Sequence, residues 1–378
     1  MSHSSGSSTS SPVSTGAPAP VPESSPDPIN APVSALSTFV EAPKSQPTKH
    51  ARSRHRTKQP LFQVYRTLVQ WVSADQWRGR RVLVTGATGF IGAVVARLLL
   101  SAEATVHGSG HTRYPPQSLH GHRAQLPPDT QRLFEAAQPE VVFHLASPIM
   151  LGEDPTLLET MRSGIVDAST EVASACAEYG ARLVHVGTCA EYGECEAPYK
   201  EQDICKPQDP YAILKLEASQ AVLERSSKQP ITVVRPFRTI GPGESRGVVA
   251  AACRAALSKQ PFPMTDGRQI REWNHVESIS TGIICAGAHP DAIGQTINIG
   301  GGERKSVKDV VQAIYQLAGT DPDHILTGDL QRRTHEVDHF WGDHSLSESL
   351  WGPITQPDLH DTLASCLQWL RKPSGGAV

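Results

Sequence analysis

The feature that most constrains this chain is a glycine-rich segment, Gly86-Ala-Thr-Gly89-Phe-Ile-Gly92, between a strand pattern and a helix pattern. The apolar residues 81–85 before it are typical of a buried strand, and apolar residues at helical spacing follow over 93–100. Glycines at this spacing permit a sharp turn and let backbone N–H groups and a helix N-terminus approach a pyrophosphate. The segment therefore predicts a dinucleotide-binding loop in an α/β fold.

Strand and helix patterns alternate after this loop. Further strand patterns cover residues 104–107, 140–145, 182–186 and 231–235, and helical patterns cover residues 165–179 and 211–225. This alternation is typical of a doubly wound parallel sheet, so we expect a Rossmann-like domain over residues 80–235. After Pro236 the pieces are shorter and interrupted by glycine and proline. They predict a smaller C-terminal α/β substrate lobe over residues 236–372, interleaved with the first domain.

The first 58 residues are rich in Ser, Pro, Thr and Ala and nearly lack large apolar side chains. Such a segment buries too little surface to offset the entropy lost on ordering, so we expect a disordered N-terminal tail. Its basic end, residues 49–58, is interpreted as a solvated arm. Residues 59–79 predict an amphipathic helix and linker whose apolar stripe packs on its own domain. A homodimer through that stripe is the alternative.

Composition narrows the class of protein. The formal net charge of −3 gives no reason to expect a nucleic-acid partner. No apolar run approaches the roughly 20 residues of a membrane helix, and the start of the chain lacks the pattern of a secretory signal. The seven cysteines are odd in number and form no CxxC pair. They favour reduced thiols over disulfides or a metal site, and we therefore expect a cytoplasmic enzyme without a bound metal.

The segment after the second strand pattern indicates which dinucleotide is bound. An acidic side chain there would hold the ribose 2′-hydroxyl of NAD, whereas basic side chains accommodate the 2′-phosphate of NADP. Residues 107–113 contain no carboxylate, while Ser109, His111 and Arg113 can all meet a phosphate. We therefore expect NADP(H), with NAD as the less favoured cofactor. The alternative that Arg113 is only a solvated loop residue stays open.

Tyr211 and Lys215 are four residues apart, and a helix would place them on one face. A free tyrosine has a pKa near 10, and a neighbouring ammonium lowers that pKa by favouring the phenolate. Thr188 follows another strand pattern, where its hydroxyl can hold a substrate oxygen. With the glycine loop upstream, these residues predict an oxidoreductase site in which Tyr211, Lys215 and Thr188 are catalytic.

Taken together, the motifs resemble the extended short-chain dehydrogenase/reductase family of the NAD-dependent epimerase/dehydratase type. The resemblance covers about residues 80–371 and is carried by segments 85–92, 144–147, 188–193, 211–215, 235–243, 271–276, 297–300, 333–338 and 341–343. It implies a Rossmann-like domain for the dinucleotide and a C-terminal lobe that closes over a nucleoside diphosphate sugar. It also implies a role for Lys215 in holding the nicotinamide ribose.

The resemblance implies further binding residues. The expected cofactor contacts, besides those after the second strand, are Gly86, Thr88, Gly89, Phe90, Ile91, Gly92, Leu145, Ala146, Ser147, Tyr211, Lys215 and Pro236. The expected substrate contacts are Glu191, Phe237, Arg238, Arg271 and Arg333. Arg271 and Arg333 match positions that bind the diphosphate, a task suited to forked charge-assisted bonds. Glu191 either orients sugar hydroxyls or pairs with a neighbour, and both interpretations stay open.

Residues 235–243, together with Glu191 and Tyr192, most resemble the GDP-4-keto-6-deoxy-D-mannose reductases. The related 4,6-dehydratases need Asp-Glu straight after the Thr, where this chain has Cys189 and Ala190. We therefore expect NADP(H)-dependent reduction of a nucleotide-linked 4-keto-deoxysugar in deoxysugar biosynthesis, with Tyr211 as the general acid. An NAD-dependent nucleotide-sugar 4-epimerase is the first alternative, and a non-catalytic dinucleotide-binding protein is the second.

Overall fold

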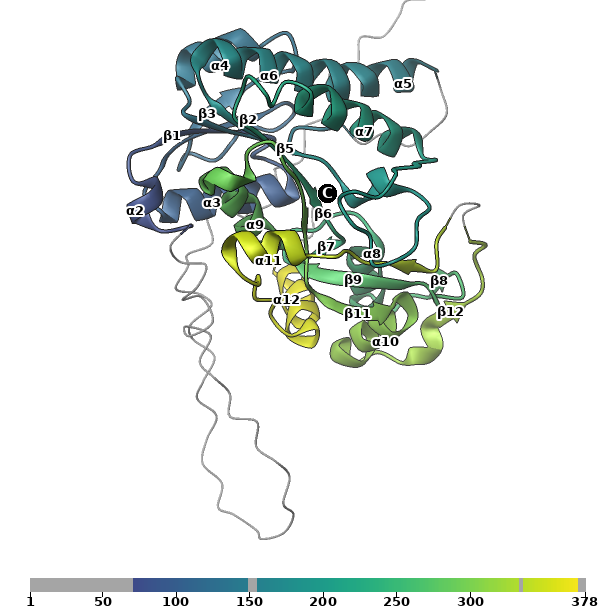
Figure 1. Cartoon of the computed structure of the whole chain (residues 1–378). Coiled ribbons are helices and arrows are strands. Elements are labelled where there is room, and N and C mark those ends of the chain that lie inside the picture. The colour runs from purple at the N-terminus through teal and green to yellow at the C-terminus, as the bar shows by residue number, and fades with distance from the viewer. Residues whose placement is uncertain (1–70, 149–154, 333–335, 373–378) are drawn as a thin grey trace, which may run out of the picture.

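A computed structural model describes residues 71–148, 155–332 and 336–372 of the chain (Figure 1). The expected tail over 1–58, most of the expected helix over 59–79 and Arg333 lie outside the described residues. Trp71 and Val72, at the end of the expected helix, are partly buried against the main hydrophobic core. A short helix, α2 (Ala74–Trp77), follows and places Trp77 fully inside that core.

The centre of the molecule is a seven-stranded sheet in which every pairing is parallel, with strand order β10-β6-β5-β4-β1-β2-β3. Its strands are β1 (Arg81–Thr85), β2 (Thr105–Gly110), β3 (His120–Arg123), β4 (Val141–His144), β5 (Arg182–Val186), β6 (Ile231–Pro236) and β10 (Thr296–Ile299). The order reverses between β1 and β4, as in doubly wound folds. The predicted Rossmann-like α/β fold is confirmed.

Helices cover both faces of this sheet (Figure 1). One face packs on α3 (Phe90–Ser101) and α9 (Val276–Ala288), and the other packs on α4 (Thr130–Ala137), α6 (Ala168–Tyr179) and α7 (Pro210–Leu223). The sequence of β1 explains this division, because Val82 and Val84 enter the first core while Leu83 enters the second. Side chains alternate along a strand, so a continuous apolar run supplies two cores at once.

A smaller lobe follows β6. Its central strand β9 (Ile270–His275) pairs with β11 (Glu303–Ser306), β13 (His339–Phe340) and β7 (Thr239–Ile240), while β8 (Phe262–Met264) pairs with β12 (Ile325–Thr327). Three helices bury one apolar core against Trp273 of β9: α8 (Val248–Leu257), α10 (Val307–Ala318) and α12 (Leu359–Arg371). Between β9 and β11 the chain returns to the large sheet as α9 and β10. The two parts are thus interleaved.

Candidate active site

The glycine loop joins β1 to α3 at the carboxyl edge of the large sheet. Gly86 has a φ of +71°, and a Cβ added there would lie 2.8 Å from the amide nitrogen of Ala146. A side chain at this position would therefore collide with the segment after β4, and glycine is required. The helix α3 begins directly after Gly89. This close-packed backbone in front of a helix N-terminus fits a dinucleotide pyrophosphate.

The hydroxyl of Thr85 holds the two cofactor segments together. Thr85 Oγ1 accepts hydrogen bonds from the backbone amides of Leu145 and Ala146, each at 3.2 Å, and lies 2.8 Å from Nδ1 of His144. Thr85 is fully buried at the end of β1. The predicted cofactor residues Leu145 and Ala146 are thus anchored beside the glycine loop. The sequence analysis did not assign this role to Thr85, although its place directly before Gly86 is a usable signal.

The segment after β2 lies against the same loop. Arg113 donates a hydrogen bond from its guanidinium to the backbone oxygen of Thr88, at 2.7 Å. The side chains of His111 and Arg113 are exposed. Ser109 lies inside β2 and is 3% exposed, so the structure corrects its assignment as a cofactor contact. The structure therefore brings Arg113 to the glycine loop and leaves its cationic group accessible to a ligand.

The helix α7 carries Tyr211 and Lys215 towards the end of β5. Asp209 caps this helix by accepting from the amide of Tyr211 at 2.9 Å, and Pro210 occupies its first position. One turn later, Lys215 Nζ donates to the carbonyl oxygen of Val186 at 2.6 Å. Val186 is the last residue of β5 and Thr188 follows two positions later, so the three predicted catalytic residues belong to adjoining segments.

Burial changes the acidity of both α7 groups. It raises the pKa of Tyr211 to about 12. It lowers the pKa of Lys215 to about 8, against the opposing effect of Glu191. The sequence argument expected Lys215 to lower the pKa of Tyr211. That expectation is wrong for the unliganded chain, where desolvation raises the pKa of Tyr211 and leaves it a neutral phenol at pH 7.

Thr188 caps a short 3₁₀ helix over Cys189–Tyr192. Its Oγ1 accepts from the amide of Ala190 at 3.3 Å, and its own amide donates to Glu191 Oε1 at 2.9 Å. The Thr188 side chain is only partly buried. Because its oxygen serves as acceptor in the cap, the O–H hydrogen can be donated to a ligand oxygen.

The structure corrects the assignment of Glu191 and Phe237 as substrate contacts. Glu191 is 0% exposed, and its carboxylate binds Thr188, Ser219 and Arg235. It therefore pairs with its neighbours, which was the second interpretation left open. Phe237 is 2% exposed within an aromatic cluster and presents almost no surface to a ligand. Both side chains support the wall of the site.

Two of the predicted substrate-binding arginines, Arg238 and Arg271, lie among the described residues, and each faces an acidic side chain. Arg238 pairs with Glu244 at 2.7 Å, and Arg271 lies 3.4 Å from Glu336. The guanidinium of Arg238 keeps about a third of its surface exposed, whereas that of Arg271 keeps 16%. Arg238 is therefore the more accessible of the two. The cofactor residue Pro236 is buried at the end of β6.

The next residue along β9, Glu272, faces away from Arg271 into a cavity of about 330 Å³. Glu272 lies 3.0 Å from Nε2 of His344 and also accepts from the amides of Gly301 and Gly342. The acidic residues Asp343 and Glu348 also line this cavity, and Arg304 adds a positively charged side chain to its lining. The buried Glu272–His344 pair thus joins β9 to the segment before α11 (Ser345–Trp351).

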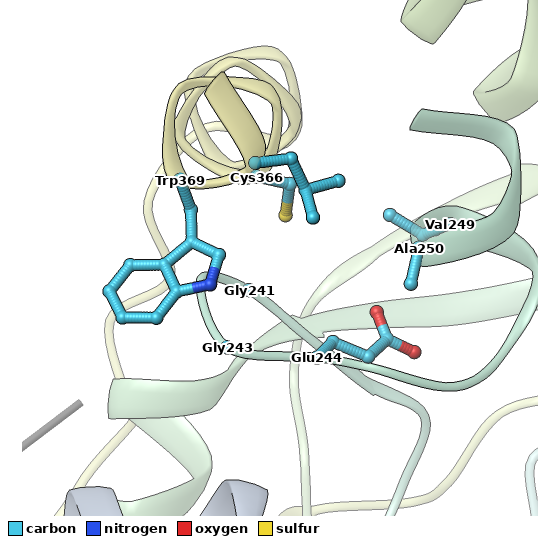
Figure 2. A pocket seen from close by; sticks show the side chains of 8 residues that line it. Gly241, Gly243, Glu244, Val249, Ala250, Cys366 and Trp369 are labelled. Carbon is cyan, nitrogen blue, oxygen red and sulfur yellow. The ribbon is translucent and has the colours of Figure 1, made fainter. Parts of the chain in front are cut away.

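A second, much smaller cavity of about 10 Å³ lies beside Glu244. Figure 2 shows the Glu244 carboxylate pointing towards Ala250 of α8, with Cys366 and Trp369 of α12 across the gap. Burial raises the pKa of Glu244 to about 7, although Arg238 and Arg254 act in the opposite direction. The same carboxylate therefore binds Arg238 and contributes a titratable group to the lobe.

The described residues contain neither a metal-binding group nor a helix that could span a membrane. In the ranges given above, no group of three or more His, Cys, Asp or Glu side chains is placed to hold a metal ion. Within the same ranges, no helix combines the length and apolar character needed to span a bilayer.

The fold and the loop define a dinucleotide-binding α/β enzyme with a Tyr and a Lys on one helix, α7. The chain belongs to the NAD dependent epimerase/dehydratase family, whose model matches residues 82–300, more than half of the sequence.

Several relatives of the chain are named as enzymes of sugar nucleotides. The chain is 28% identical over 262 residues to an uncharacterized UDP-glucose epimerase, YtcB, of Bacillus subtilis, a match covering 63% of this chain and 82% of the relative. It is 24% identical to the GDP-6-deoxy-D-mannose reductase of Pseudomonas aeruginosa, with 63% and 80% covered. Among solved structures, MoeE5 in complex with UDP-glucuronic acid and NAD matches with a TM-score of 0.70 and 26% identity, covering 77% of this chain and 99% of MoeE5.

Proposed function

We propose that this chain reduces the keto group of a nucleotide-linked 4-keto-deoxysugar with NADPH. The observation that carries the proposal is the arrangement of α7, whose Lys215 donates to Val186 at the end of β5 and whose Tyr211 is a partly buried, protonated phenol one turn earlier. A neutral phenol is the form that donates a proton. It therefore suits the direction in which a carbonyl becomes an alcohol.

Each residue has a separate task in this reaction. NADPH supplies the hydride when it is bound. The Tyr211 hydroxyl donates its proton to the sugar oxygen, and the Thr188 hydroxyl donates a hydrogen bond to the same oxygen as negative charge develops there. The Lys215 ammonium, fixed by Val186, binds the nicotinamide ribose and stabilises the phenolate that remains on Tyr211.

The preference for NADPH rests on the segment after β2. Arg113 is exposed and bound to Thr88 of the glycine loop, so it would be available to the adenosine ribose phosphate of a bound dinucleotide. Residues 107–113 still lack a carboxylate that would compete for the 2′-hydroxyl. The cationic Arg113 is therefore the group we propose for the 2′-phosphate.

The proposal is tested by assaying a panel of GDP-, dTDP- and UDP-linked 4-keto-6-deoxyhexoses with NADPH and with NADH. We expect oxidation of NADPH that depends on one of these sugars and a slower reaction with NADH. Absence of substrate-dependent oxidation across the panel, with protein that binds NADPH, would overturn the reductase assignment.

An NAD-dependent nucleotide-sugar 4-epimerase is the second candidate. It is favoured by MoeE5, whose structure contains NAD, and by the epimerase among the sequence relatives. An epimerase returns the hydride to the same sugar and needs no external dinucleotide. Purified protein that releases NAD on denaturation, and that interconverts UDP-glucose and UDP-galactose without added cofactor, would establish this activity instead.

Elimination of water is not supported by the residues after Thr188. The thiol of Cys189 is buried, which raises its pKa to about 12, and Ala190 carries no acid. A neutral thiol and a methyl group cannot exchange the protons that dehydration requires. The position after Thr188 therefore favours hydride transfer without dehydration.

A further inference from the structure

The carboxylate of Glu191 is held by three donors from three segments of the chain. Its Oε1 accepts from the amide of Thr188 and from the hydroxyl of Ser219 on α7, both at 2.9 Å, while its Oε2 accepts from Nε of Arg235 at 2.8 Å. Glu191 is 0% exposed and Arg235 is 6% exposed. An ionised carboxylate buried to this degree needs such partners. The three donors together fix the position of the Glu191 carboxylate.

The backbone beside Glu191 is shaped to admit this carboxylate. A Cβ added at Gly187 would overlap Glu191 Oε1 and would lie 3.1 Å from the hydroxyl of Ser219. Only a glycine between Val186 and Thr188 therefore lets the carboxylate reach the amide of Thr188. The chain thus has a glycine at the one position where any side chain would displace Glu191.

Arg235 is fixed on its other side as well. Its guanidinium lies 4.5 Å from the centre of the Tyr192 ring, and the Tyr192 hydroxyl donates to Asn298 Oδ1 at 2.7 Å. Burial acts to lower the pKa of Arg235, but Glu191, Tyr192 and Cys205 together outweigh it and the pKa lies above the usual value. Arg235 is therefore charged and is contacted on both sides, by Glu191 and by the Tyr192 ring.

Lys215 is a buried cation, and among the described residues Glu191 is the acidic group whose charge acts on it, although the same carboxylate also binds the Arg235 guanidinium. Two histidines face it from the adjacent strands, His144 on β4 and His185 on β5, and burial followed by the charge of Lys215 lowers the pKa of each. They are neutral at pH 7. On its own helix Tyr211 is neutral too, so Glu191 on the 3₁₀ helix supplies the negative charge that opposes desolvation of Lys215.

We infer that Glu191 is a positioning residue for the site proposed above: its carboxylate bonds the Thr188 amide and the Ser219 hydroxyl, and so fixes the backbone that carries Thr188 against α7, one helical turn from Lys215. One carboxylate in this way links two of the proposed catalytic residues, from β5 and from α7. This inference rests on the proposed function for the roles of Thr188 and Lys215, but the effect of the Glu191 charge on Lys215 can be measured without a substrate.

The direct test is a titration of Lys215 by NMR of protein labelled with ¹³C at lysine Cε, with the resonance assigned by Lys215→Arg. In Glu191→Gln, which keeps the shape but removes the charge, we expect the midpoint of Lys215 to fall by about 1 pH unit or more relative to the unsubstituted protein. Ser219→Ala is the matched control, because it removes a neutral donor to the same carboxylate. We expect that variant to keep the original midpoint.

Glu191→Gln leaves Arg235 buried without its partner, which can prevent folding. The comparison is therefore repeated between Arg235→Gln and Arg235→Gln/Glu191→Gln, where the double variant holds no unpaired arginine. The midpoint of Lys215 is expected to be lower in the double variant than in Arg235→Gln. An equal midpoint in either folded comparison would overturn the inference.

The catalytic consequence is measured separately, with the substrate found in the panel assay. In Glu191→Gln the loss of activity at high pH should begin at lower pH, with kcat reduced about 10-fold or more and KM changed less. A shifted Lys215 midpoint with no accepted sugar would leave the charge coupling intact and reject the reductase proposal. An unshifted midpoint in an active reductase would reject the role of Glu191 alone.

Discussion

The guanidinium of Arg113 donates a hydrogen bond to the backbone oxygen of Thr88 at 2.7 Å, so the segment after β2 is tied to the glycine loop. The bond uses one N–H group of a side chain that is otherwise exposed. A guanidinium has five N–H donors, and the remaining ones can bind phosphate oxygens in a forked geometry. This relationship gives the proposed cofactor preference its structural basis.

Arg113→Ala should reduce the preference for NADPH. Loss of a charge-assisted bond of about 1.5–3 kcal/mol corresponds to roughly a 10- to 100-fold rise in the KM for NADPH, with the KM for NADH little changed. Steady-state kinetics with both cofactors measure this. Arg78→Ala is the control, since Arg78 forms an exposed ion pair with Glu103 before β2, at the other edge of the sheet. Equal effects on both cofactors would contradict the assignment.

Thr188→Val and Cys189→Ala separate two neighbouring side chains of similar size. Valine removes the hydroxyl that we assign to the developing oxyanion, so kcat should fall by about 10²–10³. The Cys189 thiol, with its pKa raised to about 12 by burial, has no proposed task, so its replacement should change kcat by less than about threefold. Comparable losses in the two variants would show that the segment matters only for packing.

The carboxyl group of Glu244 should make the stability of the lobe depend on pH. Burial raises its pKa from 4.5 to about 7, so the folded chain binds this proton more tightly than the unfolded chain does. The contribution of this proton to the free energy of unfolding is therefore fully present below about pH 4.5. It is lost as the pH rises through 7, and its size is about 2–3 kcal/mol. Thermal unfolding between pH 5 and 8.5 measures it.

Glu244→Gln, which stays neutral, should gain stability relative to the unsubstituted protein over that same rise in pH. Glu159→Gln on the exposed surface of α5 (Pro155–Arg162) serves as control and should show no such trend. If the difference in stability between Glu244→Gln and the unsubstituted protein stayed constant from pH 5 to 8.5, burial would not raise the pKa of Glu244, whose surroundings Figure 2 shows.

The Glu272–His344 pair should stabilise the lobe most strongly at mildly acidic pH. Burial acts to raise the pKa of Glu272 and to lower that of His344. The hydrogen bond and the charge attraction between them, together with backbone hydrogen bonds, outweigh burial, so the pKa of Glu272 is lowered and that of His344 is raised. The Glu272 contribution is present above about pH 4.5 and lost as pH falls. The His344 contribution is present below about pH 6.5 and lost as pH rises through its folded pKa.

A double-mutant cycle with Glu272→Gln and His344→Ala checks this window. The coupling energy should be about 1–3 kcal/mol near pH 5.5 and clearly smaller at pH 8.5. Urea unfolding of the four proteins at the two pH values provides the numbers. A coupling that is independent of pH would mean that the two side chains interact without a charge on His344.

Much of the large sheet could be predicted because its strands are short apolar runs between turn residues. The predicted ranges for β1 and β5 match the structure, and the helix predicted over 211–225 corresponds to α7 (Pro210–Leu223). The strand β3 was not predicted, since His-Gly-His-Arg contains no apolar residue. It forms through backbone pairing with β2, which no property of its own side chains indicates.

Site residues that are close in the sequence could be predicted, whereas contacts between distant segments could not. Tyr211 and Lys215 are one helical turn apart, and a local spacing reveals them. Glu191 and Arg235 are separated by 44 residues and meet only because β5 and β6 are neighbours in the sheet. The pKa of Tyr211 likewise depends on burial by distant segments, which explains why the expected lowering by Lys215 was wrong for the unliganded chain.

The central claim is that the phenol of Tyr211 gives its proton to the sugar, and Tyr211→Phe tests it most directly. The measurement is the rate of substrate-dependent NADPH oxidation, together with the melting temperature and the affinity for NADPH. We predict a fall in kcat of about 10²–10⁴ with folding and cofactor binding retained. A Tyr211→Phe protein that keeps the original kcat would contradict the claim.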